Sequence, residues 1–172
     1  MNEDPMDALF DLLIEDKGFT DCAVFGMSEP DVALALQQPW VSVDNDSSGT
    51  SPEGIIGEEH PHTRAYGTFP RILRKYVREE KKLTLEEAIR KFSALPAQRM
   101  RLTDRGVLKQ GMWADVVVFD PETVRDLATF DDPNRLSEGM AYVLINGVPV
   151  IEDGKMTGAL PGKVLRGAGY VP

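Results

Sequence analysis

The chain has 172 residues, with 28 acidic and 19 basic side chains and a net charge of −9 at neutral pH. This length excludes a complete (β/α)8 barrel of roughly 250 residues, and the negative charge argues against a nucleic-acid-binding protein. One cysteine and two histidines exclude a disulfide framework and a metal centre built mainly from histidine within one copy.

Membrane and secretory segments are not expected. No run approaches the ~18 consecutive apolar residues of a membrane span. The acidic start MNEDPMD lacks the basic and apolar stretches of a secretory signal. The sequence therefore predicts a cytoplasmic protein without membrane contact.

The first 60 residues alternate between helical and strand-like patterns. A helix is expected to begin after Asp4, because apolar residues recur at helical spacing through residue 13. The apolar run 22–26 predicts a short buried strand that includes the cysteine. Ser28 is a plausible N-cap of a second short helix, which Pro39 ends.

Residues 40–43 (Trp-Val-Ser-Val) predict a second strand, which leads directly into the polar loop 44–57. Short apolar strands that alternate with helices are typical of a parallel α/β sheet. We therefore expect residues 1–60 to contribute to such a sheet.

Two further helices are expected to pack on this sheet. Pro70 is predicted at the first turn of one of them, because apolar residues follow it at helical spacing. The other begins with a capping box formed by Thr84 and Glu87 and ends before Pro96. Its apolar stripe consists of Leu85, Ala88, Ile89, Phe92 and Leu95.

Charge is distributed unevenly along the chain. Residues 1–62 hold 14 acids and one cation, whereas residues 64–101 hold 11 cations and four acids. A basic block can bind phosphate. Because this block has helical patterning, we interpret it instead as a solvated helix face of Arg and Lys side chains.

Residues 101–172 change to short β-rich runs punctuated by glycine. Strands are predicted at 115–119, 142–145 and 148–151, with a long excursion at 121–138. Asn146-Gly147 between two such runs is a strong hairpin signal, and residues 152–154 (Glu-Asp-Gly) predict a second turn. This region is expected to be antiparallel.

Three groups of residues are candidates for chemistry. A carboxylate at 44 or 46, just after a predicted parallel strand, is well placed to bind a metal or move a proton, although Asp and Asn are also ordinary turn residues. His60 and His62 can ligate zinc, or they can simply be solvated. Arg64 can bind a substrate carboxylate, or it can pair with an acid of residues 1–62.

The order of several motifs carries a family resemblance. The first half contains Asp46-Ser-Ser, Pro52-Glu-Gly, His62-Thr-Arg-Ala-Tyr-Gly-Thr-Phe-Pro-Arg71 and Leu95-Pro-Ala-Gln-Arg. The second half contains Asp104-Arg-Gly-Val-Leu, Gly111-Met-Trp-Ala-Asp and Val143-Leu-Ile-Asn-Gly-Val. Together they resemble the end of the D-aminoacylases, the N-acyl-D-amino-acid deacylases of the amidohydrolase superfamily.

This resemblance implies a two-part α/β fold. Residues 1–100 would form the C-terminal end of a TIM-like (β/α)8 barrel, with its last two strands and helices. Residues 101–172 would form a portion of a small antiparallel β-sandwich. The implied activity is zinc-dependent hydrolysis of the amide bond in an N-acyl-D-amino acid.

The resemblance also implies roles for individual residues. Asp46 matches the general acid/base and is a possible metal ligand. Arg64 matches the residue that binds the substrate carboxylate, with Tyr66 and Ser47 as further substrate-binding residues. The other zinc ligands of the family lie upstream of this region, so most would be outside this chain.

Three interpretations remain open. In the first, the chain needs an upstream barrel polypeptide or a homo-oligomer for activity, because an isolated quarter of a barrel exposes sheet edges. In the second, it is a catalytically inactive remnant that serves as an oligomeric structural or interaction module. In the third, it is a self-sufficient hydrolase that uses His60, His62 and Asp46 in an oligomer.

Overall fold

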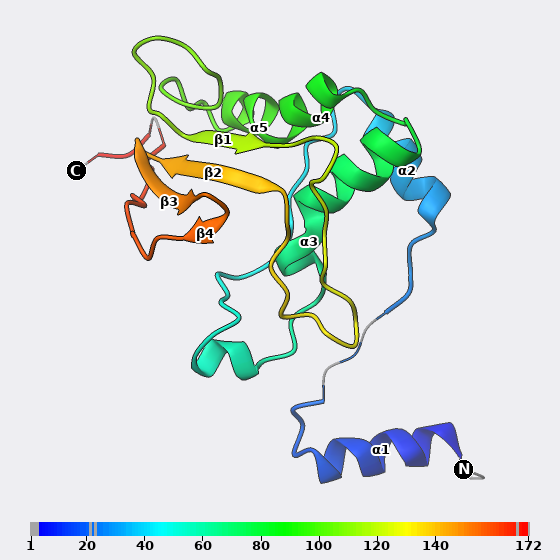
Figure 1. Ribbon diagram of the computed structural model, residues 1–172. Helices are drawn as coiled ribbons and strands as arrows, with labels where there is room; N and C mark the ends of the chain where they lie inside the picture. Colours follow the sequence, from blue (N-terminus) through cyan, green and yellow to red (C-terminus); the bar gives the residue numbers. More distant parts are fainter. Residues whose placement is uncertain (1–3, 21, 23, 168, 172) are drawn as a thin grey trace.

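The computed structural model describes residues 4–20, 22, 24–167 and 169–171. Helices occupy the first part of the chain and strands the last part (Figure 1). The helical elements are α1 (Pro5–Glu15), α2 (Glu29–Gln37), the 3₁₀ turn η1 (Ile55–Glu58), α3 (Arg64–Arg71), the π-helix η2 (Ile72–Glu79), α4 (Leu85–Phe92) and α5 (Ala94–Arg99). The strands are β1 (Val116–Phe119), β2 (Met140–Ile145), β3 (Val148–Glu152) and β4 (Lys155–Met156).

Helix α1 lies apart from the rest of the molecule, at the end of an extended segment (Figure 1). Its predicted start is confirmed, because the Asp4 carboxylate accepts the backbone N–H of Met6 and Pro5 occupies the first turn. None of its residues is buried, and the Ile14 side chain is 75% exposed. None of the described helices is long and apolar enough to cross a membrane.

The two strands predicted near the N-terminus are wrong in the described part of the chain. Residues 22, 24–26 and 41–43 form no strand, and Ala23 lies outside the described residues. Phe25 is 84% exposed, and Cys22, predicted to be buried, is exposed. A short strand is stable only when a neighbour accepts its backbone hydrogen bonds, and these two segments do not pair with each other.

The consequence is that the predicted parallel sheet is not formed by the described residues. All strand pairs of this structure are antiparallel and lie in the C-terminal region. One backbone contact holds the end of the second predicted strand, where the Val43 N–H donates to the Lys91 carbonyl at 3.3 Å. The segment 41–43 therefore lies beside α4 without regular secondary structure.

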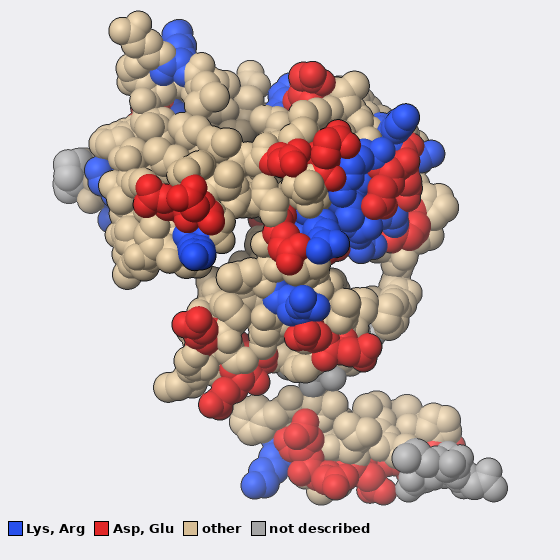
Figure 2. Space-filling view, in the orientation of Figure 1, with Lys and Arg blue, Asp and Glu red and all other residues tan. Residues whose placement is uncertain are grey.

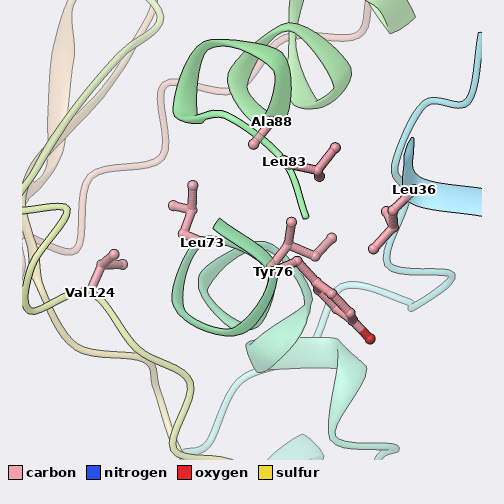
Figure 3. Close-up of a cluster of buried hydrophobic side chains, with 7 residues drawn as sticks. Leu36, Leu73, Tyr76, Leu83, Ala88 and Val124 are labelled. Carbon is pink, nitrogen blue, oxygen red and sulfur yellow. The ribbon is translucent and has the colours of Figure 1, made fainter. Parts of the chain in front are cut away.

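The core lies where α2, η2 and α4 meet the loop after β1 (Figure 3). Its buried members are Leu36, Ile72, Leu73, Tyr76, Leu83, Ala88 and Val124. The predicted N-cap of α2 is confirmed, since the Ser28 hydroxyl accepts the backbone N–H of Asp31 at 3.3 Å. Leu36 is the buried residue of α2, and Val32 and Ala33 of the same helix pack against the core beside it.

Helix α3 begins at Arg64, six residues before the predicted first turn at Pro70. Pro70 therefore lies inside the helix, where it donates no hydrogen bond to the carbonyl of Tyr66. The Ser137 hydroxyl donates to this carbonyl at 2.7 Å instead, which explains how the proline is accommodated. The helix then widens into the π-helical turn of η2, a feature that is frequent near functional sites.

The predicted helix after Thr84 is present, but it differs in two respects. The Thr84 hydroxyl accepts the Glu87 N–H at 3.2 Å, whereas the Glu87 carboxylate binds Arg90 at 2.8 Å instead of completing the capping box. The helix ends at Phe92 with Ser93 (φ −129°) as its C-cap, and Pro96 lies inside the separate helix α5. The single apolar stripe is thus divided between two helices.

The antiparallel C-terminal region is confirmed as one sheet with strand order β1-β2-β3-β4. Asn146 (φ 51°) and Gly147 (φ 83°) form the predicted turn between β2 and β3. Both residues have positive φ, as this hairpin turn requires. The second predicted turn, at Asp153-Gly154, also forms and leads into β4.

The basic block is the predicted solvated face only in part. Its exposed cations are Arg64, Arg71, Lys81, Lys82, Arg99 and Arg101, whereas others are held in ion pairs or buried. Arg74 Nε donates to Asp126 at 2.8 Å, and Arg71 lies 3.6 Å from the same carboxylate, of which only 8% is exposed. Lys75 pairs with Glu29, and the Lys91 side chain is fully buried. Basic and acidic side chains accordingly alternate on the face shown in Figure 2.

The attachment of α2 to η2 is expected to be sensitive to acid. Hydrogen bonds from Lys75 and then from Tyr76 lower the pKa of Glu29 below its ordinary value of 4.5. The resulting stabilisation is complete above that value and is lost as the pH falls below it, since protonation removes the charge that both groups bind. Between pH 6 and pH 3, the free energy of unfolding should therefore fall more in the wild type than in Glu29→Gln, as measured by urea denaturation. Glu53→Gln, at an exposed position, should match the wild type.

Candidate functional site

Asp46 and Arg64 are brought together at the start of α3. The Arg64 guanidinium lies 2.8 Å from Asp46 Oδ2, and the two side chains are 45% and 83% exposed. The carboxylate thus lies beside the first residue of a helix, where negative charge is favoured. An exposed ion pair of this kind contributes about 1 kcal/mol or less, so either partner is free to exchange it for another ligand.

Asp46 adopts a left-handed backbone conformation, with φ of 45°. This conformation is uncommon for residues other than glycine, and Asp is among those that tolerate it best. Two residues earlier, the Asp44 carboxylate accepts the backbone N–H of Asn45 at 2.8 Å. Asp44 therefore has the turn role that its residue type predicts, whereas the Asp46 carboxylate extends to α3.

The two further predicted site residues differ in their placement. Tyr66 lies on α3, and its hydroxyl is 3.2 Å from the Thr50 hydroxyl, which connects α3 to the loop after Asp46. The Ser47 hydroxyl donates to the carbonyl of Ser48 at 3.2 Å and is exposed. Tyr66 thus shares a helix with Arg64, while Ser47 makes a local contact only.

The two histidines have different environments. His62 Nδ1 accepts the backbone N–H of Arg64 at 3.1 Å, and its ring lies edge-on to Phe130 at 5.3 Å. Partial burial, followed by the positive charge of Arg64, lowers the pKa of His62. His60 is exposed. In the described part of the chain, no group of three or more His, Cys, Asp or Glu side chains is placed to hold a metal ion.

This geometry does not support a self-sufficient zinc site made of His60, His62 and Asp46. The Nδ1 atom of His62 is occupied by a backbone hydrogen bond, and Asp46 is paired with a guanidinium. A structural or catalytic zinc ion needs at least three protein ligands. The described residues do not provide such a set.

Several residues that hold the site lie in the loop between β1 and β2, and no local pattern indicated them. Asn134 Nδ2 donates to the carbonyls of Gly57 and Glu59 at 2.9 and 2.8 Å. Phe130 contacts His62, and Ser137 bonds the Tyr66 carbonyl. These contacts join positions about 70 residues apart in sequence, and local patterns carry no information about such partners.

The arrangement offers two complementary groups on one surface. A carboxylate can accept and return a proton, and a guanidinium can bind a carboxylate through two parallel hydrogen bonds. Both side chains are accessible, and Arg64 belongs to α3, which the loop before β2 holds through the bond from Ser137 to the Tyr66 carbonyl. A ligand that carries its own carboxylate is the natural partner of this surface.

Comparisons with known proteins agree with the motif order. Residues 54–151 match the family model described as the amidohydrolase family. The N-acyl-D-glutamate deacylase of Alcaligenes xylosoxydans xylosoxydans is 44% identical over 142 residues, which cover 83% of this chain and 28% of that protein. The chain thus spans little more than a quarter of the length of this curated relative.

Solved structures give the same result. A crystal structure of D-aminoacylase superposes with a TM-score of 0.69 at 40% identity, covering 77% of this chain and 27% of that one. The N-acyl-D-glutamate deacylase from Bordetella bronchiseptica, complexed with zinc and a phosphonate inhibitor, superposes with a TM-score of 0.65 at 41% identity, covering 77% and 28%. Because the family model covers more than half of its residues, this chain belongs to the amidohydrolase family.

Proposed function

We propose that this chain is the C-terminal portion of a metal-dependent amidohydrolase that hydrolyses the amide bond of N-acyl-D-amino acids. The observation that carries the proposal is the 2.8 Å contact between Asp46 and Arg64. It supports the proposal, because a carboxylate for proton transfer and a guanidinium for carboxylate binding are needed at adjacent positions for this substrate. The similarity to N-acyl-D-glutamate deacylases supports the substrate class.

In this proposal, Arg64 binds the carboxylate of the amino-acid part of the substrate. The substrate carboxylate replaces Asp46 as its partner, at little cost because the existing pair is exposed. Asp46, released from the guanidinium, takes a proton from the attacking water as the water oxygen bonds to the amide carbon. It then returns the proton to the nitrogen as the carbon–nitrogen bond breaks, which yields a carboxylic acid and the free amine.

Tyr66 and Ser47 are proposed to complete the substrate site. Tyr66 lies on the same helix as Arg64 and is connected to the Asp46 loop through Thr50. The exposed Ser47 hydroxyl lies next to Asp46 in the chain and needs only to leave the Ser48 carbonyl to reach a ligand. These two residues would adjust orientation rather than take part in bond breaking.

The zinc ion is proposed to be held mainly by residues outside this chain. The described residues do not form a zinc site by themselves, and the chain spans 28% of the deacylase that it matches. An upstream barrel polypeptide, or another copy of the chain, is therefore proposed to supply the missing part. The exposed apolar side chains of residues 19–27, among them Phe19, Val24 and Phe25, are the surface that such a partner would cover.

Residues 1–100 are proposed as the end of the barrel and residues 101–172 as the sandwich portion. In this view, segments 22–26 and 40–43 become strands once neighbouring strands are present. Their apolar composition supports this proposal. The exposure of Cys22, Val24, Phe25 and Trp40 in the isolated chain agrees with a surface that lacks its partner.

A chimera tests the function directly. In it, the matched segment of the Alcaligenes N-acyl-D-glutamate deacylase is replaced by this chain. We expect the chimera to release free amine from an N-acyl-D-amino acid, whereas the 172-residue chain alone should bind no zinc and show no hydrolysis. A folded, zinc-loaded chimera without activity would contradict the proposal.

A second candidate is an inactive remnant that serves as an oligomeric structural or interaction module. The large exposed apolar surface and the absence of a metal-binding group among the described residues favour it. It predicts an inactive chimera together with a stable homo-oligomer of the chain in light scattering at micromolar concentration. A well-folded monomer at that concentration would contradict both candidates, because neither leaves this apolar surface uncovered.

A further inference from the structure

His62 is connected to Arg64 by the first hydrogen bond of helix α3. Its Nδ1 accepts the backbone N–H of Arg64 at 3.1 Å. The residue between them, Thr63, makes no side-chain cap. The first N–H groups of a helix have no partner within the helix, so His62 supplies what Thr63 does not.

We propose that His62 is a positioning residue, which fixes the backbone of Arg64 so that its guanidinium points to the substrate carboxylate. This inference rests on the proposed role of Arg64. A side chain that accepts the backbone N–H two residues later fixes the local turn, and here that N–H belongs to the first residue of α3. The Arg64 guanidinium reaches Asp46 from this fixed starting point.

The His62 ring is itself held from the loop between β1 and β2. Phe130 lies edge-on to it at 5.3 Å and an interplanar angle of 85°, and Phe130 contacts Phe25 at 5.6 Å. Asn134 of the same loop holds the chain just before the histidine through the carbonyls of Gly57 and Glu59. Both the ring and the backbone of this segment are therefore anchored independently of α3.

The protonation state agrees with this role. A nitrogen that accepts a backbone N–H must be unprotonated, which places the ring proton of neutral His62 on Nε2. Partial burial and then the charge of Arg64 lower the pKa of His62, so the neutral form is favoured. The hydrogen bond and the electrostatic environment thus select the same form.

The first experiment uses the 172-residue chain and needs no activity. In nitrogen-15 NMR, the wild type should show His62 as the Nε2–H tautomer at neutral pH. The Arg64 amide should exchange slowly with solvent in the wild type and in His62→Asn, whose side-chain oxygen can also cap a helix. It should exchange at least about ten times faster in His62→Phe, which keeps the ring contact but has no acceptor. The exposed His60, changed to Phe, is the matched control and should leave the exchange unchanged.

The second experiment uses the chimera described above. His62→Phe should raise KM about tenfold and change kcat little, because uniform substrate binding is lost. His62→Asn should restore KM to near the wild-type value, a rescue that a purely structural role of the ring would not produce. If His62→Phe and His62→Asn have the same KM, the positioning role is wrong.

The two experiments separate the two proposals. An Nδ1–H tautomer, or Arg64 exchange that is equal in the wild type and in a folded His62→Phe variant, overturns the role of His62 whatever the chimera does. If the tautomer and exchange results are as expected but the folded chimera is inactive, the proposed enzymatic function fails. In that case the structure assigns His62 only as the cap of α3, and its role toward a substrate is overturned with the function.

Discussion

Replacing Asp46 by Asn in the chimera is expected to lower kcat by about 10²- to 10⁴-fold, the usual contribution of a general acid/base. Asn keeps the size and the hydrogen-bonding oxygen of the side chain, but it cannot accept and return a proton. The fold should be unaffected, because the 83% exposed carboxylate contributes only a surface ion pair with Arg64. Steady-state hydrolysis of an N-acyl-D-amino acid, together with the zinc content of the protein, measures the effect.

Asp44 provides a matched control two positions away. Its carboxylate is also exposed, and it accepts the backbone N–H of Asn45, a contact that an Asn side chain can keep. Asp44→Asn should therefore retain wild-type kcat. Unchanged turnover in Asp46→Asn would exclude the acid/base assignment, whereas loss of zinc together with activity would show that Asp46 acts as a metal ligand instead.

Features of the fold that depend on neighbouring residues could be predicted from the sequence. The cap at Ser28 forms as predicted, and so does the Thr84 half of the predicted capping box, because a hydroxyl and an amide three residues later are close in any helix start. The turn at Asn146-Gly147 is equally local. In each case, the interacting groups lie within a few residues of each other.

Features that depend on distant partners could not be predicted in the same way. The apolar run 22–26 has the composition of a strand, but a strand also needs a neighbour, and the described residues provide none for it. Helix α3 begins before Pro70 because the Ser137 hydroxyl, 71 residues from Tyr66, satisfies the carbonyl of that residue. Nothing near Pro70 in the sequence indicates this contact.

The same distinction between local and distant contacts holds for the candidate site. The residue types and order of the segment 46–64 indicate a carboxylate and a guanidinium for chemistry, and the structure places Asp46 and Arg64 in contact. The sequence indicated His62 only as a candidate ligand, and its bond to the Arg64 amide follows from the structure, as do the contacts of Phe130 with His62 and of Asn134 with Gly57. Contacts of this kind depend on the folded arrangement, so the composition and spacing of the sequence do not indicate them.

Lys91 has a structural role in the core that could not be predicted from the sequence. In a helical pattern rich in Arg and Lys it resembles any solvated cation, yet its side chain is fully buried. Its Nζ donates to the carbonyl of Gln38 and, at 3.0 Å, to that of Val41, and it lies 3.5 Å from the Glu87 carboxylate. A buried ammonium is tolerated only when such partners replace its water.

Lys91→Met is therefore expected to reduce the free energy of unfolding by about 2–4 kcal/mol, because two carbonyls and a carboxylate lose their shared donor in a buried environment. The loss should loosen residues 38–43, which lead directly to Asp46, so their amides should exchange faster with solvent than those of β2 and β3. Urea denaturation measures the first effect, and hydrogen exchange measures the second. The exposed Lys109 provides the control, because Lys109→Met should change the unfolding free energy by less than about 0.5 kcal/mol. Equal stability of the two variants would mean that the buried lysine does not hold this segment.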